Sequence, residues 1–126
     1  MVTSDPFDPM SYDIYLHDAK NGDVLIVRHD LRAGTYCLGG SDTAWLNITY
    51  NYSGHFRRVL GEKGIRAIYG LTAAESLPVL DAAIAQLGTD RDLDYWNPTE
   101  GNARVALENL RLLARACQPD AIWNGD

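Results

Sequence analysis

The sequence lacks the features that identify membrane, secreted and metal-binding proteins. No apolar run approaches the roughly 20 residues that span a bilayer, and the opening residues, MVTSDPFDPM, have neither the basic segment nor the apolar stretch of a signal peptide. The two cysteines, Cys37 and Cys117, have no Cys-x-x-Cys or Cys/His spacing, so we interpret both as small buried hydrophobic side chains. We therefore expect a cytoplasmic protein that contacts no membrane and holds neither metal nor cofactor.

The motifs of the common enzyme classes are also missing. There is no GxSxG, HExxH, GxGxxG or P-loop sequence. The acidic run Asp90, Asp92 and Asp94 resembles the start of a calcium-binding loop, but the glycine and the terminal glutamate of such a loop do not follow. The sequence therefore favours a binding protein over an enzyme.

Charge is distributed unevenly along the chain. The formal net charge of −6 argues against nonspecific nucleic-acid binding, which requires a basic surface. Between Ser53 and Gly70, however, a single acid, Glu62, is accompanied by four basic residues: Arg57, Arg58, Lys63 and Arg66. A basic island in an acidic chain suggests a place for a small anion. The alternative is a solvated helix face whose arginines pair with neighbouring acids.

Three segments have the pattern of β-strands. Residues 12–17 alternate apolar and polar side chains, which is the period of a half-buried strand. After the hairpin signal Asn21-Gly22, residues 23–29 are predicted to pair antiparallel with the first strand, with the apolar run 24–27 buried on both faces. Residues 33–42 are expected to form a loop that contains at most a short strand. Residues 44–52 are predicted to form the third strand.

The start of the second of three expected helices can be read in two ways. Thr72 and Glu75 have the spacing of a capping box, yet a helix begun there would place Pro78 deep enough to lose a backbone hydrogen bond. We therefore prefer Ser76 as the cap. Residues 72–75 are then a separate turn whose amides face a neighbouring segment.

The other two helices have clearer limits. Ser53 is predicted to cap the first, which ends at Gly61 or Gly64. The last is predicted to run from Thr99 as cap to about residue 117, before Pro119, and the apolar pair at 122–123 is expected to pack back on the body. Strands followed by helices predict an α+β fold, a small mainly antiparallel sheet covered on one face by two to three helices. We expect the chain to form one compact domain, in which residues 1–10 can be a flexible N-terminal segment.

The segment WLNITYNYSGHF at residues 45–56 has more polar side chains than a core strand requires. In an extended strand alternate residues share a face, so Leu46 and Ile48 are expected on the core side. The opposite face is then a row of an indole, amides and hydroxyls: Trp45, Asn47, Thr49, Asn51 and Ser53. This row can lie beside the polar side of the first strand, which carries Asp13, Tyr15 and His17. The alternative is the ordinary wet face of an antiparallel sheet.

The combination of WLNITYNYS, GIRAIYGLTAAESLPVL, DYWNPTEGNA and PDAIWNGD resembles an uncharacterised family of small proteins from bacteriophages and prophage-like regions. The resemblance covers the chain from about Ser11 onward. It implies a genomic setting, with a host cytoplasm as the location, and it implies no catalytic residues. In that setting, small proteins often act by binding a host protein or a nucleotide signal of host defence.

We therefore expect a noncatalytic binding module that sequesters a small nucleotide-like anionic ligand. Aromatic planes would stack on its ring, amides and hydroxyls would orient it, and cations would hold its phosphate. Self-association into a homo-oligomer is kept as an option. The expected ligand-binding residues are Asp13, Tyr15, His17, Trp45, Asn47, Thr49, Asn51, Ser53, His55, Arg57, Arg58 and Arg66.

Two other functions stay open. A small hydrolase acting on a glycosidic or phosphoester bond would use Asp13 or His17 as general base. An inhibitor that docks on a host protein would instead present exposed aromatic side chains, such as Tyr95 and Trp96.

Overall fold

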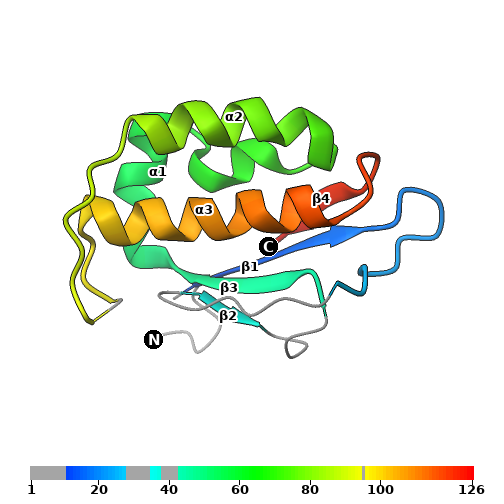
Figure 1. Ribbon diagram of the computed structural model, residues 1–126, viewed down its shortest axis with the longest axis horizontal. Coiled ribbons are helices and arrows are strands. Elements are labelled where there is room, and N and C mark those ends of the chain that lie inside the picture. The colour runs from blue at the N-terminus through cyan, green and yellow to red at the C-terminus, as the bar shows by residue number, and fades with distance from the viewer. Residues whose placement is uncertain (1–10, 28–34, 38–42, 95) are drawn as a thin grey trace, which may run out of the picture.

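The computed structural model describes residues 11–27, 35–37, 43–94 and 96–126. It contains an antiparallel sheet of four strands in the order β2-β3-β1-β4. The strands are β1 (Ser11–His17), β2 (Thr35–Cys37), β3 (Trp45–Thr49) and β4 (Ile122–Gly125). Three α-helices lie on one face of this sheet (Figure 1). The α+β fold predicted from the sequence is confirmed, whereas the predicted N-terminal segment lies outside the described residues.

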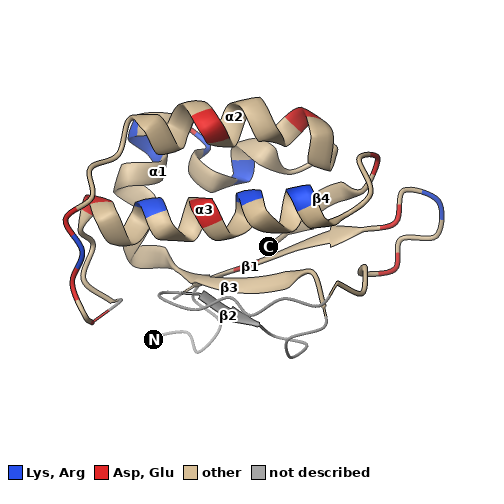
Figure 2. Ribbon diagram, viewed as in Figure 1, with Lys and Arg blue, Asp and Glu red and all other residues tan. Residues whose placement is uncertain are grey.

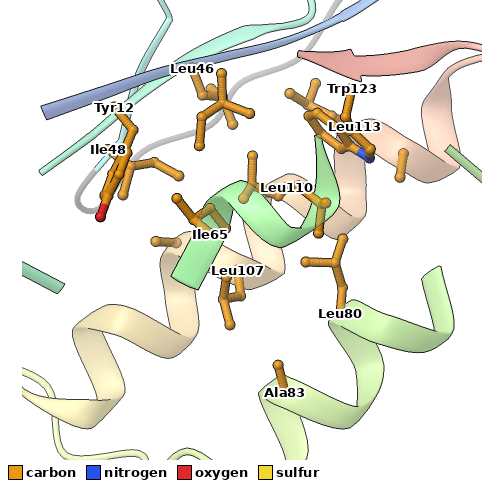
Figure 3. Packing of buried hydrophobic residues seen from close by; sticks show 14 of the residues in the cluster. Tyr12, Leu46, Ile48, Ile65, Leu80, Ala83, Leu107, Leu110, Leu113 and Trp123 are labelled. Atoms are coloured by element: carbon orange, nitrogen blue, oxygen red, sulfur yellow. The ribbon is translucent and has the colours of Figure 1, made fainter. Parts of the chain in front are cut away.

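The helices follow β3 along the chain. They are α1 (Ser53–Leu60), α2 (Ala73–Ala85) and α3 (Glu100–Ala116), and two 3-10 segments, η1 (Tyr50–Tyr52) and η2 (Gly64–Ile68), precede and follow α1. The core lies between the helices and the sheet (Figure 3). Figure 3 shows Leu46 and Ile48 of β3 pointing toward Leu110 of α3, and all three side chains are fully buried. The Leu46/Ile48 face is therefore the core side, as predicted.

The first strand is the best-predicted element of the sheet. In β1 Tyr12, Ile14 and Leu16 are buried and the residues between them are half-buried. Its antiparallel neighbour β3 places Asn47 opposite Asp13 and Trp45 opposite Tyr15. The polar sides of the two strands therefore do lie beside each other on the outer face of the sheet, the face away from the helices.

The predicted strand at residues 23–29 is wrong. The Asn21-Gly22 turn is present, with Gly22 at φ 78°, but Val24 and Ile26 form only isolated bridges, to His17 and Thr43. Ile26 is 82% exposed, so the apolar run is not buried on both faces. Leu25 instead lies between the end of β1 and the start of β3, because its amide donates to the Leu16 carbonyl and its carbonyl accepts from the amide of Ala44. The other edge of β1 pairs with β4. His29 lies outside the described residues.

The third strand ends earlier than predicted. At Thr49 the chain turns into η1, and the Thr49 hydroxyl accepts a hydrogen bond from the amide of Asn51 at 3.3 Å. The alternation stops there, so Thr49 is buried and Asn51 is exposed. Ser53 is the first residue of α1 rather than its cap. The end of that helix at Gly61, with φ 101°, is confirmed.

The predicted cap of α2 at Ser76 is also wrong. Thr72 caps the helix, and its hydroxyl and the Glu75 carboxylate form the reciprocal capping box. Pro78 is accommodated inside the helix. The Ser76 hydroxyl is buried and accepts a hydrogen bond from Trp123 Nε1 at 2.8 Å. The first-turn amides do face a neighbour, because those of Ala73 and Ala74 donate to the carbonyls of Ala121 and Pro119.

The C-terminal third of the chain agrees with prediction more closely. Thr99 caps α3 by accepting from the amide of Asn102 at 3.0 Å, and the helix ends at Cys117. The thiol of Cys117 is buried and unpaired, and burial raises its pKa to about 11. Trp123 is fully buried and lies beside Leu113 (Figure 3). The side chain of Cys37 lies outside what the structure describes.

Candidate functional site

The twelve side chains predicted to bind a ligand do not form one pocket. The structure distributes them over three places: the outer face of the sheet, the contact between α1 and the segment before α3, and the helical side of the sheet near Tyr12. Thr49 and Ser53 belong to none of these places, because Thr49 is buried in the turn and Ser53 is half-buried at the start of α1.

On the outer face, the polar side chains chiefly bind one another. The amide nitrogen of Asn47 donates to the Asp13 carboxylate at 2.8 Å and to the Ser11 hydroxyl at 2.6 Å. Both of its donors are therefore used within the protein. This pairing explains why a poor strand-former occupies a central strand, because Asn47 ties β3 to β1 through its side chain as well as its backbone.

The same face carries a short row of rings. The Tyr15 and Trp45 centroids lie 5.3 Å apart, and those of Tyr15 and His17 lie 6.1 Å apart. Trp45 Nε1 is shielded from solvent and has no hydrogen-bond partner. His17 Nδ1 lies 3.0 Å from the Asp18 carbonyl, so that nitrogen carries the proton.

Asn51, His55 and Arg58 fasten α1 to the segment that leads into α3. Asn51 donates to the Trp96 carbonyl at 2.8 Å, and His55 Nε2 lies 2.7 Å from the Pro98 carbonyl. A carbonyl can only accept, so Nε2 carries the proton and Nδ1 is free to accept from Arg58, 3.3 Å away.

Arg58 completes this contact through Glu100. Its guanidinium lies 3.2 Å from the Glu100 carboxylate, which also accepts from the amide of Gly88 at 2.9 Å. The Gly88 amide and then Arg58 hold the pKa of Glu100 below its usual range. Three of the predicted ligand-binding side chains therefore have partners inside the protein.

Arg66 lies at the centre of the third place. Its guanidinium carbon is 5.2 Å from the centroid of the Tyr12 ring and 5.8 Å from that of Tyr50. The two rings stack with centroids 4.6 Å apart, and Arg66 Nε donates to the main-chain oxygen of Asp126 at 2.9 Å. A hydrogen bond with the Tyr50 side chain is the main reason that the pKa of Arg66 is raised. Arg66 is thus held in place by stacking and by two hydrogen bonds.

Arg57 is the second arginine that acts on the Tyr12 hydroxyl. It is exposed, and no acidic side chain of the described residues lies within ion-pair distance of it. Burial raises the pKa of Tyr12, while Arg66 and Arg57 lower it in part, so both guanidinium groups act on this hydroxyl. We call Tyr12, Tyr50, Arg57 and Arg66 the Tyr–Arg cluster. Figure 2 shows the basic residues of α1 and η2 on the helical side of the sheet.

The glycine at position 64 keeps this arrangement compact. Gly64 has φ 60°, a backbone conformation that side chains rarely adopt, and a Cβ there would lie 3.5 Å from Arg57 Cγ. It lies between α1, which carries Arg57, and Arg66 of η2.

Sequence reasoning found the two arginines of the cluster and missed the two tyrosines. Strand periodicity places Tyr12 and Tyr50 on the core side together with Leu46 and Ile48, and Tyr12 is indeed buried. Tyr50 is half-buried because η1 begins there. The available signal was the presence of Asn51 and Ser53 shortly after Thr49, because both residue types favour turns.

Metal-ligand groups and membrane-spanning helices can be checked in the described residues. They contain no group of three or more His, Cys, Asp and Glu side chains that could hold a metal ion. None of the helices in the described part of the chain is both long and apolar enough to cross a bilayer.

Comparison of the chain with family models, curated proteins and solved structures gives no significant match. The relationship to phage proteins therefore stays a prediction from sequence motifs. The function has to be argued from the site itself.

Proposed function

We propose that the protein is a noncatalytic binding module for a small anionic ligand, with the Tyr–Arg cluster as the site of its charged group. The observation that carries the proposal is the Arg66 guanidinium held over the stacked Tyr12 and Tyr50 rings. Arg57, which also acts electrostatically on Tyr12, has no acidic partner among the described residues. A bound anion would be attracted by both positive charges.

The chemistry of the cluster favours a phosphate group. Arg66 is already oriented by stacking on the two rings, so little conformational entropy would be lost when its free N–H groups bind oxygens. Arg57 supplies a second set of donors. A phosphate monoester presents several acceptor oxygens to such donors, and charge-assisted hydrogen bonds of this kind are the strong ones.

A nucleotide-like ligand is the class that follows from the sequence, and the phage resemblance implies sequestration of a host-defence signal. The geometry favours the phosphate part of that ligand. The ring row of Tyr15 and Trp45 lies on the opposite face of the sheet from Arg66, which contacts the core-side residue Tyr12. The base would therefore contact α1 and η2 rather than the ring row.

Chemical-shift mapping tests this proposal. Uniformly 15N-labelled protein is titrated with a nucleoside 5′-monophosphate and, separately, with the matching nucleoside. We expect saturable shifts of the amides of Tyr50, Arg57, Gly64 and Arg66 with the monophosphate and much weaker shifts with the nucleoside. Saturable shifts confined to the amides of β1 and β3 on the outer face, or no saturable shift, would contradict the proposal. The ligand recovered unchanged after incubation would separate a binder from a hydrolase.

An exposed loop keeps the alternative of docking on a host protein open. Leu93 is fully exposed and Trp96 is 44% exposed in the loop between α2 and α3. Apolar side chains of this kind are common anchors at protein interfaces. Tyr95 lies outside the described residues.

A further inference from the structure

A second place for a ligand lies between the loop after α2 and the outer side of α3. It is a pocket of about 250 Å³ lined by Thr89, Arg91, Gly101, Arg104, Val105 and Glu108. At roughly 30 Å³ per water molecule, the volume corresponds to about eight waters. It is smaller than the roughly 300–1,000 Å³ of sites for drug-sized ligands, so only a compact ligand fits.

The loop wall of the pocket is fixed to the helix. The amide of Gly101 donates to the Asp90 carbonyl at 3.1 Å, and the amide of Gly88 donates to Glu100 at 2.9 Å. A Cβ at Gly101 would lie 2.5 Å from the Asp90 carbonyl oxygen, so only glycine permits this close approach. The pocket is therefore built before any ligand enters.

Charges of both signs line this pocket. Arg104 Nη1 donates to the Leu87 carbonyl at 3.0 Å and its Nε lies 3.6 Å from the Glu108 carboxylate, so its guanidinium is oriented while other donors stay free. Arg91 is exposed, and no acidic side chain within the described ranges lies at ion-pair distance from it. Glu108 supplies a carboxylate and Val105 an apolar surface.

From this juxtaposition we propose that the pocket binds a small zwitterionic amino carboxylate. The carboxylate of the ligand binds the guanidinium groups of Arg91 and Arg104, and its ammonium group binds Glu108. A short apolar side chain contacts Val105. A phosphate dianion is disfavoured here, because Glu108 lines the same small volume. The site is separate from the Tyr–Arg cluster, so either proposal can fail without the other.

NMR titration with three matched compounds tests this assignment. L-valine has all three features, 3-methylbutanoate lacks the amine, and 2-methylpropylamine lacks the carboxylate. We expect valine to give saturable shifts at the amides of Thr89, Arg91 and Gly101. Loss of the bonds to Glu108 should weaken 3-methylbutanoate binding about tenfold, and the amine should not bind. A valine titration without saturable shifts at these amides, or an amine that binds as tightly as valine, would overturn the proposal.

Two variants and a control assign the contacts. Arg91→Ala should weaken valine and 3-methylbutanoate about tenfold or more, because both use the guanidinium. Glu108→Gln should reduce valine affinity to that of 3-methylbutanoate. Arg115→Ala, which removes an exposed arginine elsewhere on α3, should change neither. If Glu108→Gln retained the preference for valine, the ammonium site would be refuted. Arg57→Ala should leave valine binding intact while weakening monophosphate binding by about tenfold or more.

Discussion

The buried hydrogen bond between Trp123 and Ser76 allows a quantitative test of how α2 begins. Both residues are fully buried, and the indole Nε1 donates to the Ser76 hydroxyl at 2.8 Å, while that hydroxyl donates to the Ala73 carbonyl at 2.8 Å. Ser76→Ala leaves the indole N–H buried without an acceptor, which costs about 1–3 kcal/mol. Alanine recovers roughly 0.5 kcal/mol of helix propensity. We therefore expect a net destabilisation of about 0.5–2.5 kcal/mol.

The companion variant removes the donor instead. Trp123→Phe eliminates the N–H and leaves a smaller ring in the core, so its cost is about 2–3 kcal/mol from the lost hydrogen bond and lost contacts. In this background the hydroxyl of Ser76 has no indole to accept from. Ser76→Ala should then be neutral or stabilising by up to about 0.5 kcal/mol.

Urea denaturation of the wild type, both single variants and the double variant gives the coupling energy. Circular dichroism at 222 nm is the appropriate signal, because it does not depend on Trp123. The structure predicts a coupling of about 1–3 kcal/mol. A helix cap at Ser76, as the sequence suggested, would cost about 0.5–2 kcal/mol on mutation regardless of Trp123. Additive effects would therefore refute the hydrogen bond and support the cap.

Three further predictions follow from the site description. Asn51→Ala should leave anion affinity unchanged. It should speed amide hydrogen exchange in residues 96–100, because the Asn51 side chain donates to the Trp96 carbonyl. A loss of affinity without faster exchange would place Asn51 in the ligand site. Gly101→Ala should destabilise the fold by about 1–3 kcal/mol because of the contact with Asp90, and a melting temperature equal to that of the wild type would contradict the close approach. The folded-state pKa of Glu100 is lowered, so its contribution to stability is present above its unfolded pKa and is lost as pH falls through the folded pKa. Glu100→Gln should therefore reduce the loss of unfolding free energy at acid pH. An unchanged loss would show that Glu100 does not contribute to it.

The sequence predicted elements whose signals are local. Alternation located β1, and caps located both ends of α3 and the end of α1. It did not predict elements whose limits depend on distant partners. The pairing of β4 with β1 joins residues far apart in the chain, and Leu25 bonds to both Leu16 and the distant Ala44. The cap of α2 is a different case, because the capping box of Thr72 and Glu75 is a local signal that Pro78 does not exclude.

For the candidate site, too, the sequence predicted the contacts that follow from strand alternation and did not predict those between distant segments. The pairing of β1 with β3 brought Asp13 to Asn47, as the shared polar face suggested. The contacts that occupy Asn51 and His55 join positions 45 and 43 residues apart and have no signature in the sequence. Arg57 and Arg58 are adjacent and equally basic, yet among the described residues only Arg58 has an acid beside it. Their roles could be separated only by the three-dimensional arrangement.

Isothermal calorimetry on Arg57→Ala tests the central claim most directly. The variant, Arg115→Ala as a matched control and the wild type are titrated with a nucleoside 5′-monophosphate and with the nucleoside. If the Tyr–Arg cluster holds the phosphate, Arg57→Ala should lose about 1.5–3 kcal/mol of binding free energy for the monophosphate, and the control should lose none. Affinity for the nucleoside should be the same in all three proteins. Equal monophosphate affinity in Arg57→Ala and the wild type would contradict the account.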